Sequence, residues 1–240
     1  MAYCGMVTAT FLFDAALDPF LPREQRGLVF DVPCARAATV KHMIEALGVP
    51  HTEVGDITVD GAPAPLDALL EDGDSVVVPA VAPVVLSRAE ARFVADAHLG
   101  GLARLLRMAG FDTLYDNAID DAEVEANAEI GGRIALTRDR ELLKRRGVLR
   151  GAYVRALKPA QQLREVFDRY GLAAAMRPFS LCLACNVPLR SVLKAEVEDE
   201  LPPSVRATHT EFLKCDRCGG VFWQGSHWRR MRALLDATTG

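Results

Sequence analysis

The sequence lacks any apolar run near the roughly 20 residues that a membrane-spanning helix needs. Its first residues also lack the basic start, apolar stretch and small-residue cleavage site of a secretory signal. We therefore expect a cytoplasmic protein with no membrane partner. A phosphate-binding P-loop, a dinucleotide-binding GxGxxG and a GxSxG nucleophile motif are missing too. These absences argue against the nucleotide-binding and serine-hydrolase classes that such motifs mark.

The composition is that of an ordinary globular protein. Hydrophobic residues make up 50% of the 240 residues and charged residues 25%, which excludes wholesale disorder and a collagen-like fibre. This length predicts one to two domains. The net charge of −4 is unevenly distributed, because residues 1–90 hold 5 Lys and Arg against 13 Asp and Glu, whereas residues 91–240 hold 23 against 19. The imbalance suggests two parts with different partners.

The N-terminal segment, residues 1–83, has the pattern of a small β-rich domain with one helix. Alternating apolar residues predict strands, and Thr39 is a suitable N-cap for the helix. The expected elements are strands at Val7–Phe13 and Leu28–Val32, a helix at Val40–Leu47, and strands at Asp56–Val59 and Ser75–Val78. This order is that of a β-grasp domain.

From Arg92 onward the pattern alternates between strand and helix. Short apolar runs and amphipathic stretches follow one another, which predicts βαβ units and a mainly parallel sheet. The expected strands are Phe93–Ala95, Asp112–Tyr115, Arg133–Thr137 and Ala152–Ala156. The expected helices are Leu99–Ala109, Asp121–Ile130 and Pro159–Tyr170, and the segment Asp139–Lys144 is expected to begin a further helix.

Carboxylates follow the predicted strands of this second segment. Asp96 and Asp139 come after the first and third strands, and ligands bind at the carboxyl ends of strands in an open parallel sheet. Several carboxylates at one edge would repel each other without a cation, and such oxygen ligands suit Mg²⁺ or Mn²⁺. Asp116, Asp120, Asp121 and Glu125 are further candidates for this site, although Asp120 and Asp121 could equally cap a helix.

Basic residues accompany these carboxylates. An RNA backbone crossing the strand ends would meet them, whereas the alternative is an ordinary solvated helix surface. The RNA-binding candidates are Arg104, Arg107, Arg138, Arg140 and Lys144.

Four of the six cysteines form two CxxC pairs near the C-terminus. Cys182 and Cys185, then Cys215 and Cys218, have the ligand spacing of two knuckles that close one structural zinc site. Redox chemistry is the alternative, but it needs only one such pair. The neighbouring aromatics could stack on bases or could form the core of a small zinc module; they are Phe222, Trp223 and Trp228.

Together these residues resemble the PIN-like RNase family named for the C-terminal domain of the mut-seven exonuclease. The resemblance covers about residues 91–232. The matching stretches are FVADAHLGGLARLLRMAGFDTLYDN (93–117), GGRIALTRDRELLKRR (131–146), CLACNVPL (182–189) and CDRCGGVFWQGSHWRRM (215–231). The first segment is similar to the ubiquitin-like domain that precedes this RNase domain in many members, through TVKHMIEALGVPHTEV (39–54) and LEDGDSVVV (70–78).

The resemblance implies a metal-dependent ribonuclease. Its acidic residues map to Asp96 and Asp139, with Asp120 or Asp121 as the third. The chain departs from the family pattern after the fourth strand, where Lys158 and Pro159 stand in place of a fourth acidic residue. A second metal ion would therefore bind poorly.

We accordingly expect three domains. They are a ubiquitin-like β-grasp domain at 1–83, a PIN-like α/β domain at 91–176 and a zinc ribbon at 177–240. The expected function is Mg²⁺- or Mn²⁺-dependent hydrolysis of RNA, with Zn²⁺ as a structural ion and a protein partner for the ubiquitin-like domain. The alternative is a non-catalytic RNA-binding or adaptor protein that uses the basic residues and the ribbon.

Overall fold

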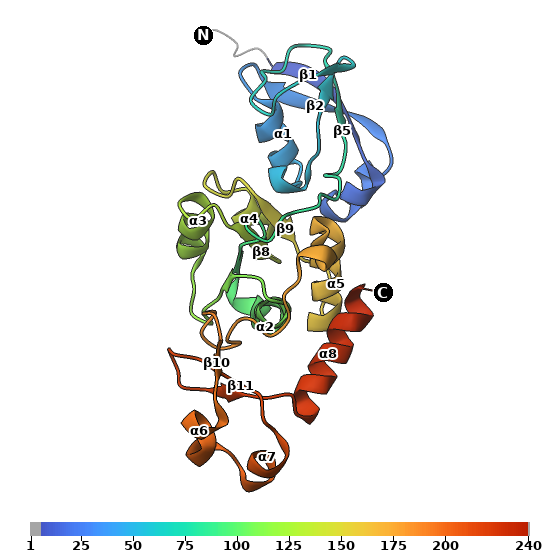
Figure 1. Cartoon of the computed structure of the whole chain (residues 1–240). Coiled ribbons are helices and arrows are strands. Elements are labelled where there is room, and N and C mark those ends of the chain that lie inside the picture. The colour runs from blue at the N-terminus through green and yellow to red at the C-terminus, as the bar shows by residue number, and fades with distance from the viewer. Residues whose placement is uncertain (1–5, 240) are drawn as a thin grey trace. The chain divides into compact units, whose positions relative to one another are not determined.

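The computed structural model describes residues 6–239, which belong to two compact units (Figure 1). The first unit combines the described part of residues 1–82 with residues 137–153, and the second combines residues 83–136 with the described part of 154–240. Within residues 6–239, no helix has both the length and the apolar character needed to cross a bilayer.

The first unit contains a five-stranded mixed sheet in the order β2-β1-β5-β3-β4. β1 runs antiparallel to β2 and parallel to β5, as in a β-grasp fold, so this part of the predicted fold is confirmed. The elements are β1 Met6–Phe13, β2 Val29–Ala35, α1 Val40–Ala46, β3 Thr58–Val59, β4 Ala62–Pro63 and β5 Ser75–Val78.

Strand alternation builds the core of this unit. Ala9, Phe11 and Phe13 of β1 are buried, because every second side chain of a strand points to the same face. Val40 and Ile44 of α1 are buried in the same core. Full burial of one such large apolar side chain is worth about 1.5–3 kcal/mol.

Residues 137–153 contain α4 (Arg140–Leu143) and β9 (Gly151–Tyr153) and pack in the first unit. The Tyr153 ring meets the Phe20 ring edge-on at 5.2 Å between centroids. The backbone N–H of Tyr153 donates to the buried Glu53 carboxylate at 2.9 Å. His51 Nε2 lies 3.0 Å from the carbonyl oxygen of Val148. The β-grasp sheet and this later segment are therefore parts of one packed body.

The second unit contains a parallel sheet in which β6 lies between β7 and β8. The strands are β6 Phe93–Ala95, β7 Thr113–Leu114 and β8 Ile134–Thr137. All residues of β6 and β8 are buried, which explains why their sequences are continuous apolar runs. The predicted parallel sheet is thus confirmed.

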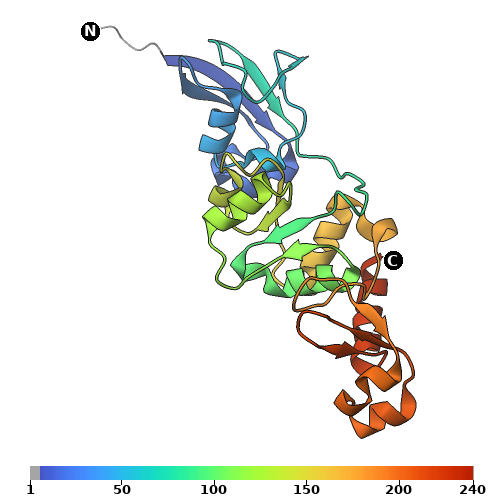
Figure 2. The same ribbon diagram turned by 60° about the vertical axis from the view of Figure 1, so that its left-hand side comes forward.

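Four longer helices belong to the second unit. They are α2 Gly100–Ala109, α3 Asp121–Glu129, α5 Pro159–Tyr170 and α8 Ser226–Thr239. α5 packs against both α2 and α8 (Figure 1, Figure 2). Gly110 ends α2 with φ 93°, a left-handed conformation that glycine adopts without steric cost.

The C-terminal part of this unit is a small antiparallel sheet with its own core. The sheet order is β10-β11-β12, and Val192, Val197, Leu201 and Phe212 form the buried cluster. Its elements are β10 Arg190–Val192, α6 Lys194–Val197, α7 Pro203–Thr208, β11 Phe212–Lys214 and β12 Val221–Phe222.

The predicted bounds of an element agree best with the observed bounds where a capping residue marks its end. α5 covers the predicted residues, between Lys158 and the left-handed Gly171. The fourth strand of the second segment is an exception, because β9 ends at Tyr153 and not at Ala156. Instead, the Glu165 carboxylate accepts the backbone N–H groups of Arg155 and Ala156.

Candidate functional site

The four paired cysteines converge in space. The Sγ atoms of Cys182, Cys185, Cys215 and Cys218 all lie within 4.8 Å of one another, and those of Cys182 and Cys218 are 3.8 Å apart. A tetrahedral zinc ion with Zn–S bonds of about 2.3 Å requires Sγ atoms about 3.8 Å apart. The donor set therefore fits one Zn²⁺ with no open coordination position. Within residues 6–239 no other three His, Cys, Asp or Glu side chains form such a group.

The two knuckles share one backbone design. Asn186 N–H donates to the Cys182 carbonyl and Gly219 N–H donates to the Cys215 carbonyl, each at 2.9 Å. Both donors have positive φ, 59° for Asn186 and 74° for Gly219. Asparagine and glycine tolerate this left-handed conformation better than other residues. The sequences CLACN and CDRCG are thus two versions of the same turn.

The thiols differ in how readily they ionise. Burial raises the pKa of Cys215, but the backbone N–H groups of Cys218 and Arg217 hydrogen-bond to its sulfur and, with the neighbouring thiols, lower the pKa to about 7. Hydrogen bonding to Cys218 and then burial raise the pKa of Cys185 to about 12. Zinc binds thiolates, so metal binding would have to displace the protons that the cluster holds.

The first knuckle is tied to the α/β part of the second unit by a buried arginine. Arg107 of α2 is 6% exposed. Its guanidinium donates to the carbonyls of Leu183 and Ala184 in the knuckle, at 3.1 and 2.9 Å, and to that of Thr113 at 2.9 Å. Because its donors are directed into the protein, Arg107 has a structural role here, and its RNA contact stays a prediction.

A second tie passes through Asn186 and Asp112. The Asn186 amide donates to the Asp112 carboxylate at 2.6 Å and accepts the N–H of Thr113 at 3.0 Å. Arg133 donates to both oxygens of the same carboxylate. Burial raises the pKa of Asp112, but the hydrogen bonds from Arg133 and Asn186 outweigh this and hold it below its usual value. Sequence reasoning missed this network. A usable signal was that the first CxxC pair is followed by an asparagine, Asn186, where the second pair is followed by a glycine, Gly219.

The predicted catalytic carboxylates all lie near helix starts. Asp96 follows β6 and caps the 3₁₀ helix Ala97–Leu99 by accepting His98 N–H at 3.3 Å. Asp120 forms a capping box with Glu123 at the start of α3, and Asp121 is the first residue of that helix. The capping interpretation of Asp120 thus accounts for its position. Asp116 also bonds locally, accepting Ala118 N–H at 2.8 Å.

Asp139 lies in the first unit and is exposed. Its Oδ1 accepts the N–H of Glu141 at 2.8 Å as the cap of α4. Within the described chain, Oδ2 has no hydrogen-bond or ion-pair partner. This oxygen remains able to bind a cation.

The other predicted RNA-binding residues fall into two groups. Arg140 donates to the carbonyls of Pro19 and Phe20, at 2.8 and 3.1 Å, and lies over the Phe20 ring. Lys144 donates to Glu141 at 2.7 Å. In the described residues, Arg104 and Arg138 have no hydrogen-bond or ion-pair partner for their guanidinium groups. They are the two candidates that keep their charge available for a phosphate.

These features define an α/β domain that carries a four-cysteine knuckle pair and is preceded by a ubiquitin-like sheet. Family models support both parts: the Mut7-C RNAse domain matches residues 91–235, and the Mut7-C ubiquitin domain matches residues 6–85. The chain belongs to the Mut7-C RNAse domain family. A search of the curated proteins and a search of the solved structures found no match. The division of residues 91–240 at position 177 stays a prediction.

Proposed function

We propose that the protein is a ribonuclease that requires Mg²⁺ or Mn²⁺, with Asp96 and Asp139 as metal ligands and Asp120 or Asp121 as a third. The observation that carries this proposal is the position of the first two. Asp96 and Asp139 follow the carboxyl ends of β6 and β8, which pair in parallel, in a chain of an RNase family. Ligands of open parallel sheets bind at these strand ends.

The donor set suits a hard divalent cation. Carboxylate oxygens are the ligands that Mg²⁺ and Mn²⁺ prefer, and the Oδ2 atom of Asp139 is available. A bound ion would stabilise negative charge on the phosphoryl oxygens during cleavage. Arg104 and Arg138 would hold neighbouring phosphates of the RNA. We further propose that the four-cysteine cluster holds Zn²⁺ as a structural ion.

One observation favours a second function, RNA binding without cleavage. Three of the candidate carboxylates have a local role, because Asp96, Asp120 and Asp139 accept backbone N–H groups as caps. Helix capping alone explains an acidic residue at such a position. In this alternative the ribbon and the exposed arginines bind RNA, and the acidic residues only stabilise helices.

Cleavage of labelled RNA distinguishes the two functions. Single-stranded and structured RNAs are incubated with the full chain and Mg²⁺, Mn²⁺ or EDTA. Asp96→Asn and Asp139→Asn should each lower turnover by about 10²-fold or more, whereas Asp168→Asn on α5, an exposed control, should not. Cleavage that persists in EDTA would refute metal dependence. RNA binding with no cleavage in any condition would establish the alternative.

A further inference from the structure

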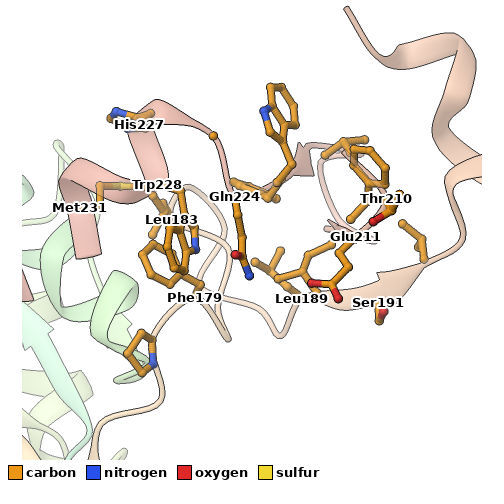
Figure 3. A pocket seen from close by; sticks show the side chains of 18 of the residues that line it. Phe179, Leu183, Leu189, Ser191, Thr210, Glu211, Gln224, His227, Trp228 and Met231 are labelled. Atoms are coloured by element: carbon orange, nitrogen blue, oxygen red, sulfur yellow. The ribbon is translucent and has the colours of Figure 1, made fainter. Parts of the chain in front are cut away.

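A cavity of about 710 Å³ opens in the C-terminal part of the second unit, away from the candidate carboxylates (Figure 3). Its walls come from the three ribbon strands, the segment around residues 178–189 and the beginning of α8. This volume lies within the 300–1,000 Å³ that is usual for small-molecule sites. Both tryptophans of the chain, Trp223 and Trp228, line it.

The cavity has one aromatic wall. The rings of Phe179 and Trp228 lie 4.9 Å apart between centroids, with an angle of 31° between their planes. Leu183 and Met231 lie beside them, and Figure 3 shows these four side chains together on one side. A wall of this kind offers a flat π surface to a planar ligand.

Polar side chains face this wall. Figure 3 shows Glu211, Ser191 and Thr210 on the other side of the cavity, with Gln224 between them and Trp228. Gln224 and Glu211 are exposed, and neither side chain forms a hydrogen bond or ion pair with another residue of the described chain. An amide donates and accepts, whereas a carboxylate only accepts. The cavity therefore suits a flat ring whose edge carries N–H donors.

Positive charge lies next to the cavity. Arg230 is one helical turn after Ser226 and His227, which line the cavity, so the three share one face of α8. Arg230 is exposed and its guanidinium has no partner among the described residues. By contrast, Arg232 on the same helix is paired with Asp236 at 2.9 Å. A free guanidinium beside a flat, polar-edged cavity suits a phosphate attached to the ring.

We propose that this cavity binds one unpaired nucleobase of single-stranded RNA. The base stacks on the Phe179–Trp228 wall, its amino-bearing edge donates to Glu211 and bonds Gln224, and the adjoining phosphate contacts Arg230. Single-stranded RNA is recognised in this way, by stacking on aromatics and hydrogen bonding to base edges. The proposal rests on RNA as the ligand of the protein. The carboxylate favours cytosine, whose N4 amino group is a donor, over uracil.

Tryptophan fluorescence tests the site directly, because both tryptophans line the cavity. The full-length protein is titrated with ten-nucleotide oligo(C) and oligo(U) without added Mg²⁺ or Mn²⁺, and RNA affinity is measured in parallel by anisotropy. Oligo(C) should quench the emission and bind more tightly than oligo(U). Glu211→Gln should reduce this preference, because an amide accepts at one atom only and presents a donor at the other.

Matched variants separate stacking from packing. Trp228→Leu and Gln224→Ala should each weaken oligo(C) binding by about tenfold, a typical cost of losing one stacked or bonded base. Trp228→Phe keeps an aromatic face and should retain most of the affinity. Arg230→Ala should weaken binding and lower its salt dependence by about one phosphate contact. The paired Arg232→Ala is the control and should have little effect.

Three results would overturn the proposal, and only one of them would also overturn the proposed function. If the protein binds RNA but Trp228→Leu and Gln224→Ala, with zinc content intact, bind it as the wild type does, the cavity does not hold a base. That outcome would leave a protein segment as the occupant. If the wild type binds no RNA at all, both this proposal and the ribonuclease function fail. If the protein cleaves RNA but oligo(C) does not quench its tryptophan emission, only the base-binding role of the cavity is refuted.

Discussion

The amide of Asn186 donates a 2.6 Å hydrogen bond to the carboxylate of Asp112, 74 residues earlier in the chain. This contact joins a cysteine knuckle to the residue that precedes β7. Arg107 makes a parallel connection to the carbonyls of the same knuckle. The cysteine knuckle and the α/β sheet should therefore unfold together, as one cooperative structure, in the second unit.

The stability of this structure should depend on the Asn186 side chain. Asn186→Gly keeps the positive φ of 59° but removes the amide, which leaves Thr113 N–H without its acceptor and takes one donor from Asp112, which keeps its bonds from Arg133. We expect the free energy of unfolding to fall by about 1–3 kcal/mol. Urea unfolding followed by circular dichroism measures this. Asn117→Gly, at an exposed position, is the control, and an equal loss in both variants would contradict the assigned role.

The Asp112 carboxylate should make stability depend on pH in the acidic range. Its pKa in the folded protein lies below the usual value, whereas the unfolded chain has a value of about 3.9. Its contribution is therefore fully present above about pH 4 and is lost as the pH falls through the folded-state pKa. The difference in unfolding free energy between wild type and Asp112→Asn should narrow as the pH is lowered below about 4. A difference that stays constant between pH 7 and 3 would refute this linkage.

Zinc should hold the C-terminal segment in its folded form. Cys215→Ser removes one of four thiolates, so we expect loss of the metal and rapid proteolysis within residues 177–239. Metal analysis and limited trypsin digestion measure the two effects. A chelator should reproduce them in the wild type, whereas Cys34→Ser, outside the cluster, should keep the metal. If metal analysis found no zinc in the purified wild-type protein, this prediction would be wrong.

Arg140 should contribute to stability and little to RNA affinity. Its guanidinium donates to the carbonyls of Pro19 and Phe20 and lies 5.1 Å from the centre of the Phe20 ring. Arg140→Ala should lower the unfolding free energy by about 1–3 kcal/mol. Arg146→Ala, an exposed neighbour, is the matched control for stability. If Arg140→Ala weakened RNA binding at unchanged stability, the original RNA-binding interpretation would be correct.

Local sequence patterns predicted the elements of this protein better than the partners of its charged residues. The buried run of β6, the Thr39 cap and the CxxC pairs each carry their signal within a few residues. The environments of Arg107 and Arg140 depend on chain segments 76 and 120 residues away. A basic residue beside a predicted active site looks the same in sequence whether it faces solvent or bonds a distant carbonyl. That distinction requires the three-dimensional structure.

The first unit is discontinuous along the chain: it takes residues up to 82, omits residues 83–136 and is completed by residues 137–153. During synthesis the ribosome must therefore deliver Tyr153 before Glu53 and Phe20 can acquire their final contacts. The N-terminal sheet is therefore synthesised first, but its packing is completed only after residues 137–153 have been synthesised. A single protease cut between residues 82 and 83 would break the peptide bond without removing those contacts, so the two fragments should remain associated.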